Sequence, residues 1–146
     1  MIGVRRDEDN SQTVPAGFAL VFPDQFAEIE ASGSRGDFIA VITSASANEH
    51  ALAYAAAAER ISLRNAVLAI PAGQETSDLF GDLRRSDHAS FWDAGKPAVF
   101  LTDTGEFRHD NYHCIGGPDL VADLDLAFAT AVTRATAEAS AVALKM

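Results

Sequence analysis

Three short apolar runs constrain the fold of this chain more than any other feature. They span residues 38–42, 66–70 and 98–102, and each is continuous rather than alternating and contains β-branched side chains. This pattern is typical of strands that are buried on both faces of a sheet. Segments with helical spacing lie between the runs. The alternation predicts an α/β fold of three layers, α/β/α, with a mostly parallel sheet.

The helical segments are recognised by their end signals and by their spacing. Residues 23–32 begin with a proline and stop before Gly33, and residues 46–61 form an alanine-rich helix. A short helix is expected at residues 86–92, and one long helix from Asp119 onward. One face of this long helix carries the residues expected to pack into the core: Leu120, Leu124, Phe128, Val132 and Ala135.

Composition limits the possible partners. The chain has 146 residues, of which 48% are hydrophobic, and this predicts a single domain over residues 1–146. A net charge of -10 argues against a nucleic-acid partner, because phosphate contacts need clustered Lys and Arg. No apolar stretch suits a membrane helix or a signal peptide, so we expect no membrane partner, and the compartment stays open. Cys114 is the single cysteine, which excludes an intrachain disulfide.

Three motifs hold most of the residues with chemical potential. They read R-S-D-H-A-S-F-W at 85–92, P-A-V-F-L-T-D-T at 97–104 and N-Y-H at 111–113. In this order and spacing they resemble the last third of the co-catalytic zinc exopeptidases, the family of the bacterial leucyl-type aminopeptidases and, more distantly, the glutaminyl cyclases. M-I-G at 1–3 is similar to a strand of that family. The resemblance implies a truncated domain, the C-terminal portion of a zinc aminopeptidase-like fold.

The resemblance also implies roles for four residues. His113 matches the last zinc-ligating histidine of the family, and neutral imidazole is a suitable zinc ligand. Tyr112 matches a catalytic tyrosine that donates a hydrogen bond to the developing oxyanion. Asp87, the other predicted catalytic residue, matches an acid that either supports the metal ligands or faces the substrate. Arg85 matches an arginine that contacts substrate oxygens. The implied ligand is a peptide or an amino acid.

Several family residues have no counterpart here. The family holds two zinc ions through an H-x-D segment, a Glu-Glu pair, the aspartate before M-I-G and the last histidine, and uses a separate glutamate as base. This sequence contains neither H-x-D nor Glu-Glu, and it begins at Met1, after the position of that aspartate. Catalytic zinc ordinarily needs three protein ligands. We therefore expect an aminopeptidase-like hydrolase that is inactive as this chain and binds zinc weakly or not at all. The alternative is a non-catalytic, degenerate module with a binding or structural role.

Simpler interpretations stay open for the same residues. His113 is equally well a loop histidine without metal, and Asp87 can simply support the start of its helix. His109 and His113 have the spacing of a zinc pair on a helix, but the residues between and after them disfavour a helix. A Cys114–His113 nucleophile pair is disfavoured because adjacent side chains point apart. Phe91 and Trp92 line either a substrate pocket or the core.

Position in the fold gives two further expectations. Ligands of α/β sheets bind outside the carboxyl ends of the strands, so we expect the loop at 103–117 there, with Asp87, Tyr112 and His113 converging. A truncated half-domain would also leave an open sheet edge near residues 1–4, which invites pairing with another chain. We therefore expect a homodimer.

Overall fold

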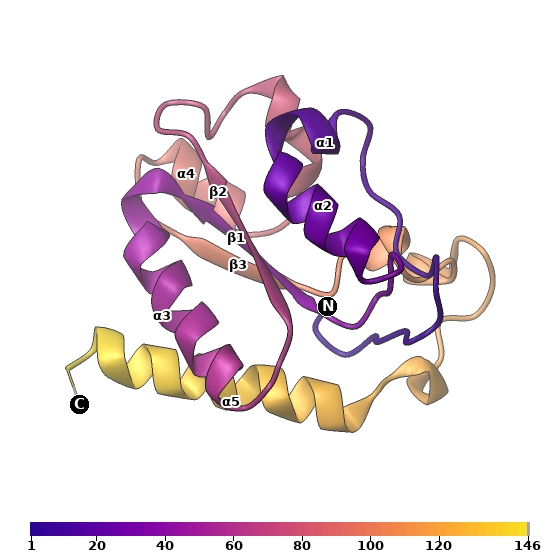
Figure 1. The fold of residues 1–146 in the computed structure, drawn as a ribbon. Coiled ribbons are helices and arrows are strands. Elements are labelled where there is room, and N and C mark those ends of the chain that lie inside the picture. Colours follow the sequence, from indigo (N-terminus) through magenta and orange to yellow (C-terminus); the bar gives the residue numbers. More distant parts are fainter. Residues whose placement is uncertain (146) are drawn as a thin grey trace.

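The computed structural model describes residues 1–145, which form a three-stranded sheet, helices and the loops that connect them (Figure 1). The strands are β1 (Ile39–Ser44), β2 (Asn65–Ile70) and β3 (Val99–Thr102). The α-helices are α1 (Phe18–Val21), α2 (Pro23–Ala31), α3 (Asn48–Arg60), α4 (His88–Asp93) and α5 (Leu126–Ala143). Short 3₁₀ helices are η1 (Ala45–Ala47), η2 (Asp78–Arg84), η3 (Gly105–Phe107), η4 (Tyr112–Cys114) and η5 (Val121–Asp123).

The sheet is mixed, with strand order β2-β1-β3. β1 pairs with β2 in parallel and with β3 in antiparallel orientation. The connection between β2 and β3 starts and ends at the same end of the sheet, because Ile70 lies opposite Ser44 and Val99 lies opposite Thr43. The chain thus re-enters the sheet without crossing its length, and β3 runs back along β1. The predicted α/β class is confirmed, whereas parallel pairing holds for one of the two strand pairs.

Because β3 is antiparallel to β1, the loop that follows β3 lies at the opposite end of the sheet from the one expected. Thr102 lies opposite Ala40, at the beginning of β1. Residues 103–117 therefore start beside the amino end of β1 and β2. The expectation that this loop lies at the carboxyl end of the strand over residues 38–42 is wrong, and the cause is the antiparallel pairing.

Both faces of the sheet are covered by helices (Figure 1). Alternate residues of β1 point to opposite sides: Ala40 and Ile42 join the cluster on the α1–α2 side, and Ile39 and Val41 join the cluster on the α3–α5 side. The first cluster also contains Phe18, Phe22, Ile29, Phe38, Leu68, Phe80 and Trp92. The second also contains Ala51, Tyr54, Ala57, Leu63, Phe128, Val132 and Ala135.

The last helix starts later than its sequence pattern indicates. α5 begins at Leu126, and Asp125 caps it by accepting a 2.9 Å hydrogen bond from the N–H of Phe128. The predicted core positions Phe128, Val132 and Ala135 are buried. Leu120 and Leu124 lie ahead of the helix and are exposed, so their place on the predicted apolar face is wrong.

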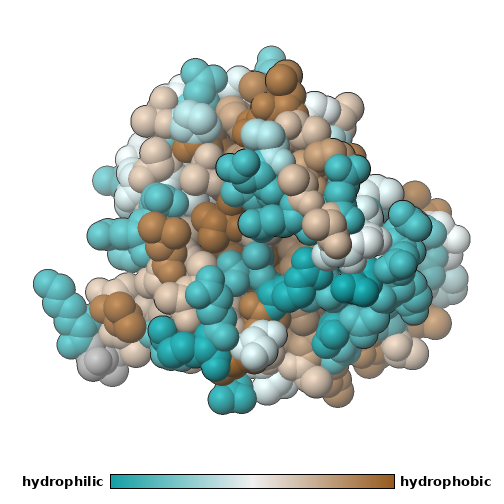
Figure 2. All heavy atoms as spheres, viewed as in Figure 1, coloured by the Kyte–Doolittle hydropathy of each residue, from teal (hydrophilic) through white to brown (hydrophobic). Residues whose placement is uncertain are grey.

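Hydrophobic surface residues occur in separate spots among hydrophilic ones on the face seen in Figure 2. The most exposed large hydrophobic residues include Leu20, Ile115 and Val121. Within residues 1–145, the helices are too short or too polar to cross a membrane.

Candidate functional site

A cavity of about 90 Å³ lies between the sheet and the loops around it. Phe38, Ile42 and Phe100 form part of its apolar wall, on the side of the sheet that α1 and α2 cover. A larger engineered cavity of about 150 Å³ holds benzene. The volume and the apolar wall here leave room for a small apolar group.

An ion pair stands where the cavity meets solvent. Arg85, in the turn before α4, pairs through Nη1 with Oε1 of Glu106, in η3, and both residues line the cavity. Their side chains are 50% and 35% exposed. The guanidinium predicted to contact substrate oxygens thus has an anionic neighbour that the sequence motifs did not indicate. Together the two side chains present one positive and one negative group beside an apolar space.

Tyr112 lines the same cavity because its ring lies over Gly105. A Cβ at Gly105 would meet the ring at 3.3 Å, and the backbone φ of 57° there also favours glycine. The His113 ring lies 4.1 Å from the Tyr112 ring, centroid to centroid, in an edge-on arrangement. Glycine at position 105 is therefore what allows the tyrosine to reach this position.

Two of the four predicted site residues lie outside the cavity lining. Asp87 is exposed at the start of α4, and its carboxylate makes no capping hydrogen bond. His113 is exposed in η4 with a left-handed φ of 54°. Of the pair at 91–92, Phe91 is on the surface, while Trp92 is core and donates a 3.2 Å hydrogen bond to the carbonyl of Ala98. The structure thus brings Arg85 and Tyr112 to one cavity.

A buried polar network connects the cavity with the N-terminal segment. Oε1 of Gln12 accepts hydrogen bonds from Nε of Arg108 at 2.9 Å and from Oγ1 of Thr104 at 3.1 Å. Nη1 of Arg108 donates to the carbonyl of Val4 at 3.1 Å, and its guanidinium lies over the Phe38 ring. Burial lowers the pKa of Arg108 to about 10, although nearby carboxylates oppose this shift. Arg108 therefore stays cationic at neutral pH.

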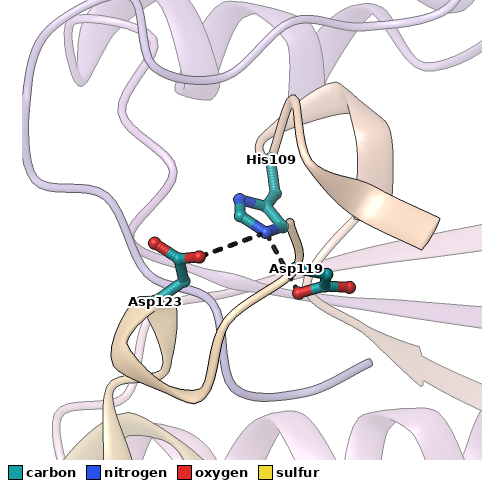
Figure 3. Close-up of side chains that lie close together, drawn as sticks. All are labelled: His109, Asp119 and Asp123. Carbon is teal, nitrogen blue, oxygen red and sulfur yellow. Dashed lines mark hydrogen bonds and ion pairs between the residues drawn. The ribbon is translucent and has the colours of Figure 1, made fainter. Parts of the chain in front are cut away.

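A second group of polar side chains joins the loop at 103–117 to the segment just before α5 (Figure 3). His109, Asp119 and Asp123 place one potential metal-ligating atom each within 4.8 Å of the others. Among residues 1–145, no other set of three or more His, Cys, Asp or Glu side chains lies close enough together to hold an ion. His113 is not part of this group. The residues available around His113 thus do not fit a zinc site of the family type.

Sequence reasoning missed Glu106, Gln12 and the His109 group. Glu106 follows a predicted strand, but a lone glutamate in a loop has no distinguishing spacing. The sequence spacing relates His109 only to His113, on a helix that does not form. Its aspartate neighbours lie 10 positions and more away in the sequence, so no short motif connects them.

Comparison of the chain with protein-family models, with curated proteins and with solved structures gives no match.

Proposed function

We propose that this chain is a zinc-exopeptidase-like domain whose cavity binds the first residue of a peptide. The observation that carries this proposal is that Arg85 and Tyr112 line one cavity. These are the two residues to which the family resemblance assigns contacts with substrate oxygens and with the oxyanion. Helices on both faces of the sheet also agree with a three-layer peptidase scaffold.

In this proposal the apolar wall receives an aliphatic side chain, and the ion pair at the mouth receives the peptide end. Glu106 is the anion available to a free α-amino group, and Arg85 is the cation available to a carbonyl oxygen. A ligand that offers both groups replaces the contact that the two residues make with each other. A peptide with a free amine and a branched first side chain matches this set.

Hydrolysis needs more than this chain contains. Zinc, when bound in the intact family, polarises the scissile carbonyl and lowers the pKa of a bound water. The H-x-D segment and the Glu-Glu pair that serve this chemistry are absent from the sequence. We therefore propose that the residues present bind and orient a peptide, with zinc held weakly or not at all at His113 and without turnover.

A second candidate is a non-catalytic module with a structural role. What favours it is the pairing of Arg85 with Glu106, which partly neutralises the guanidinium. This candidate predicts no peptide binding, so one titration separates the two.

The test is a titration of the ¹⁵N-labelled chain with the peptide Leu-Gly-Gly. We expect saturable shifts of the amides of Leu68, Phe100 and Tyr112, and none with the N-acetylated peptide. Ala66→Leu fills the cavity and should abolish the shifts. Ala69→Leu is the matched control, because Ala69 lies on the same strand but is exposed. Equal binding by both variants, or by the acetylated peptide, would refute the proposal, and a thermal melt of each variant verifies that it is folded.

A further inference from the structure

A buried imidazole faces two carboxylates beside the loop that follows β3 (Figure 3). Nε2 of His109 lies 3.3 Å from Oδ1 of Asp119 and 3.8 Å from Oδ2 of Asp123. The His109 side chain is only 4% exposed, whereas the two aspartates are 33% and 28% exposed. The ring nitrogen therefore points from the interior toward a pair of solvent-accessible anions.

We propose that His109, Asp119 and Asp123 form a binding site for a divalent transition metal of the zinc class. Zinc binds imidazole nitrogen and carboxylate oxygen at about 2.0–2.2 Å, and neighbouring ligand atoms around a tetrahedral ion are then about 3.4 Å apart. The 3.3 Å between His109 and Asp119 already has this value. Asp123 must approach further, because its Oδ2 lies 3.8 Å from the same nitrogen and also accepts a 3.3 Å hydrogen bond from the N–H of Leu120.

The imidazole decides which class of cation fits. Calcium and magnesium take oxygen ligands almost entirely, whereas imidazole together with carboxylate suits zinc and its neighbours among the transition metals. A site made only of surface aspartates would have no such preference. The buried nitrogen of His109 is the feature that separates this group from an ordinary acidic cluster. Three protein ligands leave at least one position for water.

Arg6 occupies the opposite side of the ring. Its Nη2 lies 3.3 Å from Nδ1 of His109 and 3.8 Å from Oδ1 of Asp123. A guanidinium only donates hydrogen bonds, so Nδ1 accepts and the imidazole proton is on Nε2, facing Asp119. A metal can bind Nε2 only after Nε2 has lost its proton. The neutral ring then carries its proton on Nδ1 instead. Arg6 must then move away, so it competes with the metal as an internal cation.

The proposed site is distinct from the one that the family resemblance implies. That resemblance assigns zinc to His113, which is exposed and outside this group. The two assignments therefore make opposite predictions for the same pair of substitutions. The inference is also independent of the cavity, because zinc binding at His109 and peptide binding at Arg85 involve different side chains and different readouts.

The experiment is a calorimetric titration of the chelator-treated chain with zinc chloride, with magnesium chloride as the comparison ion. We expect one zinc per chain and no comparable magnesium binding. Asp119→Asn changes an exposed ligand and should weaken zinc binding by at least about tenfold, since even outer-shell partners of metal ligands contribute that much. Arg6→Met removes the competing cation, keeps the unbranched stem, and should strengthen zinc binding. His113→Ala should leave the affinity unchanged.

Each alternative outcome has a clear meaning. Loss of zinc binding in His113→Ala with full binding in Asp119→Asn would overturn the proposal in favour of the family site. Absence of saturable zinc binding in both the wild-type chain and Arg6→Met would overturn it outright. A titration with cobalt adds an independent readout, because tetrahedral coordination gives visible absorption that Asp119→Asn should remove.

Discussion

The backbone N–H of Gly3 donates a 2.9 Å hydrogen bond to Oδ2 of Asp103, 100 positions later in the chain. The N–H of Val4 donates to the same oxygen at 2.9 Å, and the N–H of Gly105 donates to Oδ1 at 3.3 Å. The N–H of Asp103 in turn donates to the carbonyl of Met1 at 3.0 Å. Asp103 is fully buried. One carboxylate thus fastens the N-terminal segment to the end of β3.

Replacing this carboxylate should destabilise the fold. In Asp103→Asn the amide NH₂ group faces backbone donors, so at least one buried N–H loses its acceptor. Arg108 also loses a nearby negative charge that supports its cationic form. We expect a loss of about 3 kcal/mol in the free energy of unfolding, the upper range for a hydrogen bond to a charged group. Urea denaturation measures it.

Asp24→Asn is the matched control, because Asp24 is exposed in the first turn of α2. It should change the free energy of unfolding by less than about 0.5 kcal/mol, as surface substitutions usually do. A similarly small change in Asp103→Asn would mean that the N-terminal segment is fastened by other contacts.

The strands could be predicted from local sequence because their residues are apolar on both faces. The runs at 38–42, 66–70 and 98–102 match β1, β2 and β3 within two residues at either end. The orientation of β3 could not be predicted in this way. It depends on the path of the chain from Ile70 to Val99, and the polar, 3₁₀-rich segment there has no periodicity that reveals whether it crosses the sheet.

The candidate sites were predictable only where a motif marks them. Arg85 and Tyr112 belong to recognisable motifs, and both line the cavity. Glu106 has no motif, and its pairing with Arg85 arises from the fold of η3 against the turn before α4. The contact between His109 and Asp119 forms because the chain after residue 113 folds back toward His109. Such contacts between distant residues are absent from the local pattern that sequence reasoning uses.

The purified chain should not hydrolyse aminoacyl nitroanilides above background, with or without added zinc. The reason is the absence of the H-x-D segment, the Glu-Glu pair and the glutamate base from the sequence. The absorbance of released nitroaniline provides the assay. Zinc-dependent turnover that persists through purification and disappears in His113→Ala would contradict this prediction.

Tyr54 should tolerate the loss of its hydroxyl. It lies on α3 and is buried in the cluster that α3 and α5 form against the sheet, and over residues 1–145 its hydroxyl has no hydrogen-bond partner. Burial raises the pKa of this phenol far above its ordinary value, so the group is neutral. Tyr54→Phe removes an unpaired polar atom and should leave stability unchanged or raise it by up to about 1 kcal/mol.

Tyr54→Ala is the contrasting variant, because it removes the ring as well. It should cost about 3–5 kcal/mol, the range for deleting a buried aromatic side chain. Thermal and urea unfolding measure both changes. If Tyr54→Phe were as damaging as Tyr54→Ala, the hydroxyl would have a partner that the structure lacks.

The chain should form a homodimer at micromolar concentration. The open edge expected near residues 1–4 is wrong, because these residues form no strand and the buried Val4 donates its N–H to Asp103. The edges are instead β2 and β3 of the three-stranded sheet, and neither contains a lysine or proline that would discourage edge pairing. Ile115 and Val121 are 80% and 82% exposed, which adds apolar surface. Light scattering measures the mass directly. A stable monomer would show that the domain is self-sufficient and would remove this argument for a truncated half.

Stability should fall as the pH decreases through the ordinary pKa of histidine, and His88 is the cause. The ring is buried, stacks on Phe100 at 4.5 Å, and its Nε2 lies 2.7 Å from the carbonyl of Leu83. Nε2 therefore carries the proton, and Nδ1 is left buried without a partner over residues 1–145. Burial lowers the pKa of His88 below its ordinary value of 6.5.

The sign of the effect follows from proton linkage. Above about pH 7.5, one unit over the unfolded pKa, His88 is neutral in both states and contributes no pH dependence. Below 6.5 the unfolded chain binds a proton that the folded chain resists, so the free energy of unfolding decreases until the pH passes the lower, folded pKa. Urea midpoints from neutral to mildly acidic pH measure this slope. His88→Gln should flatten it, whereas His50→Gln, on the exposed surface of α3, should not. An unchanged slope in His88→Gln would assign the acid sensitivity to another group.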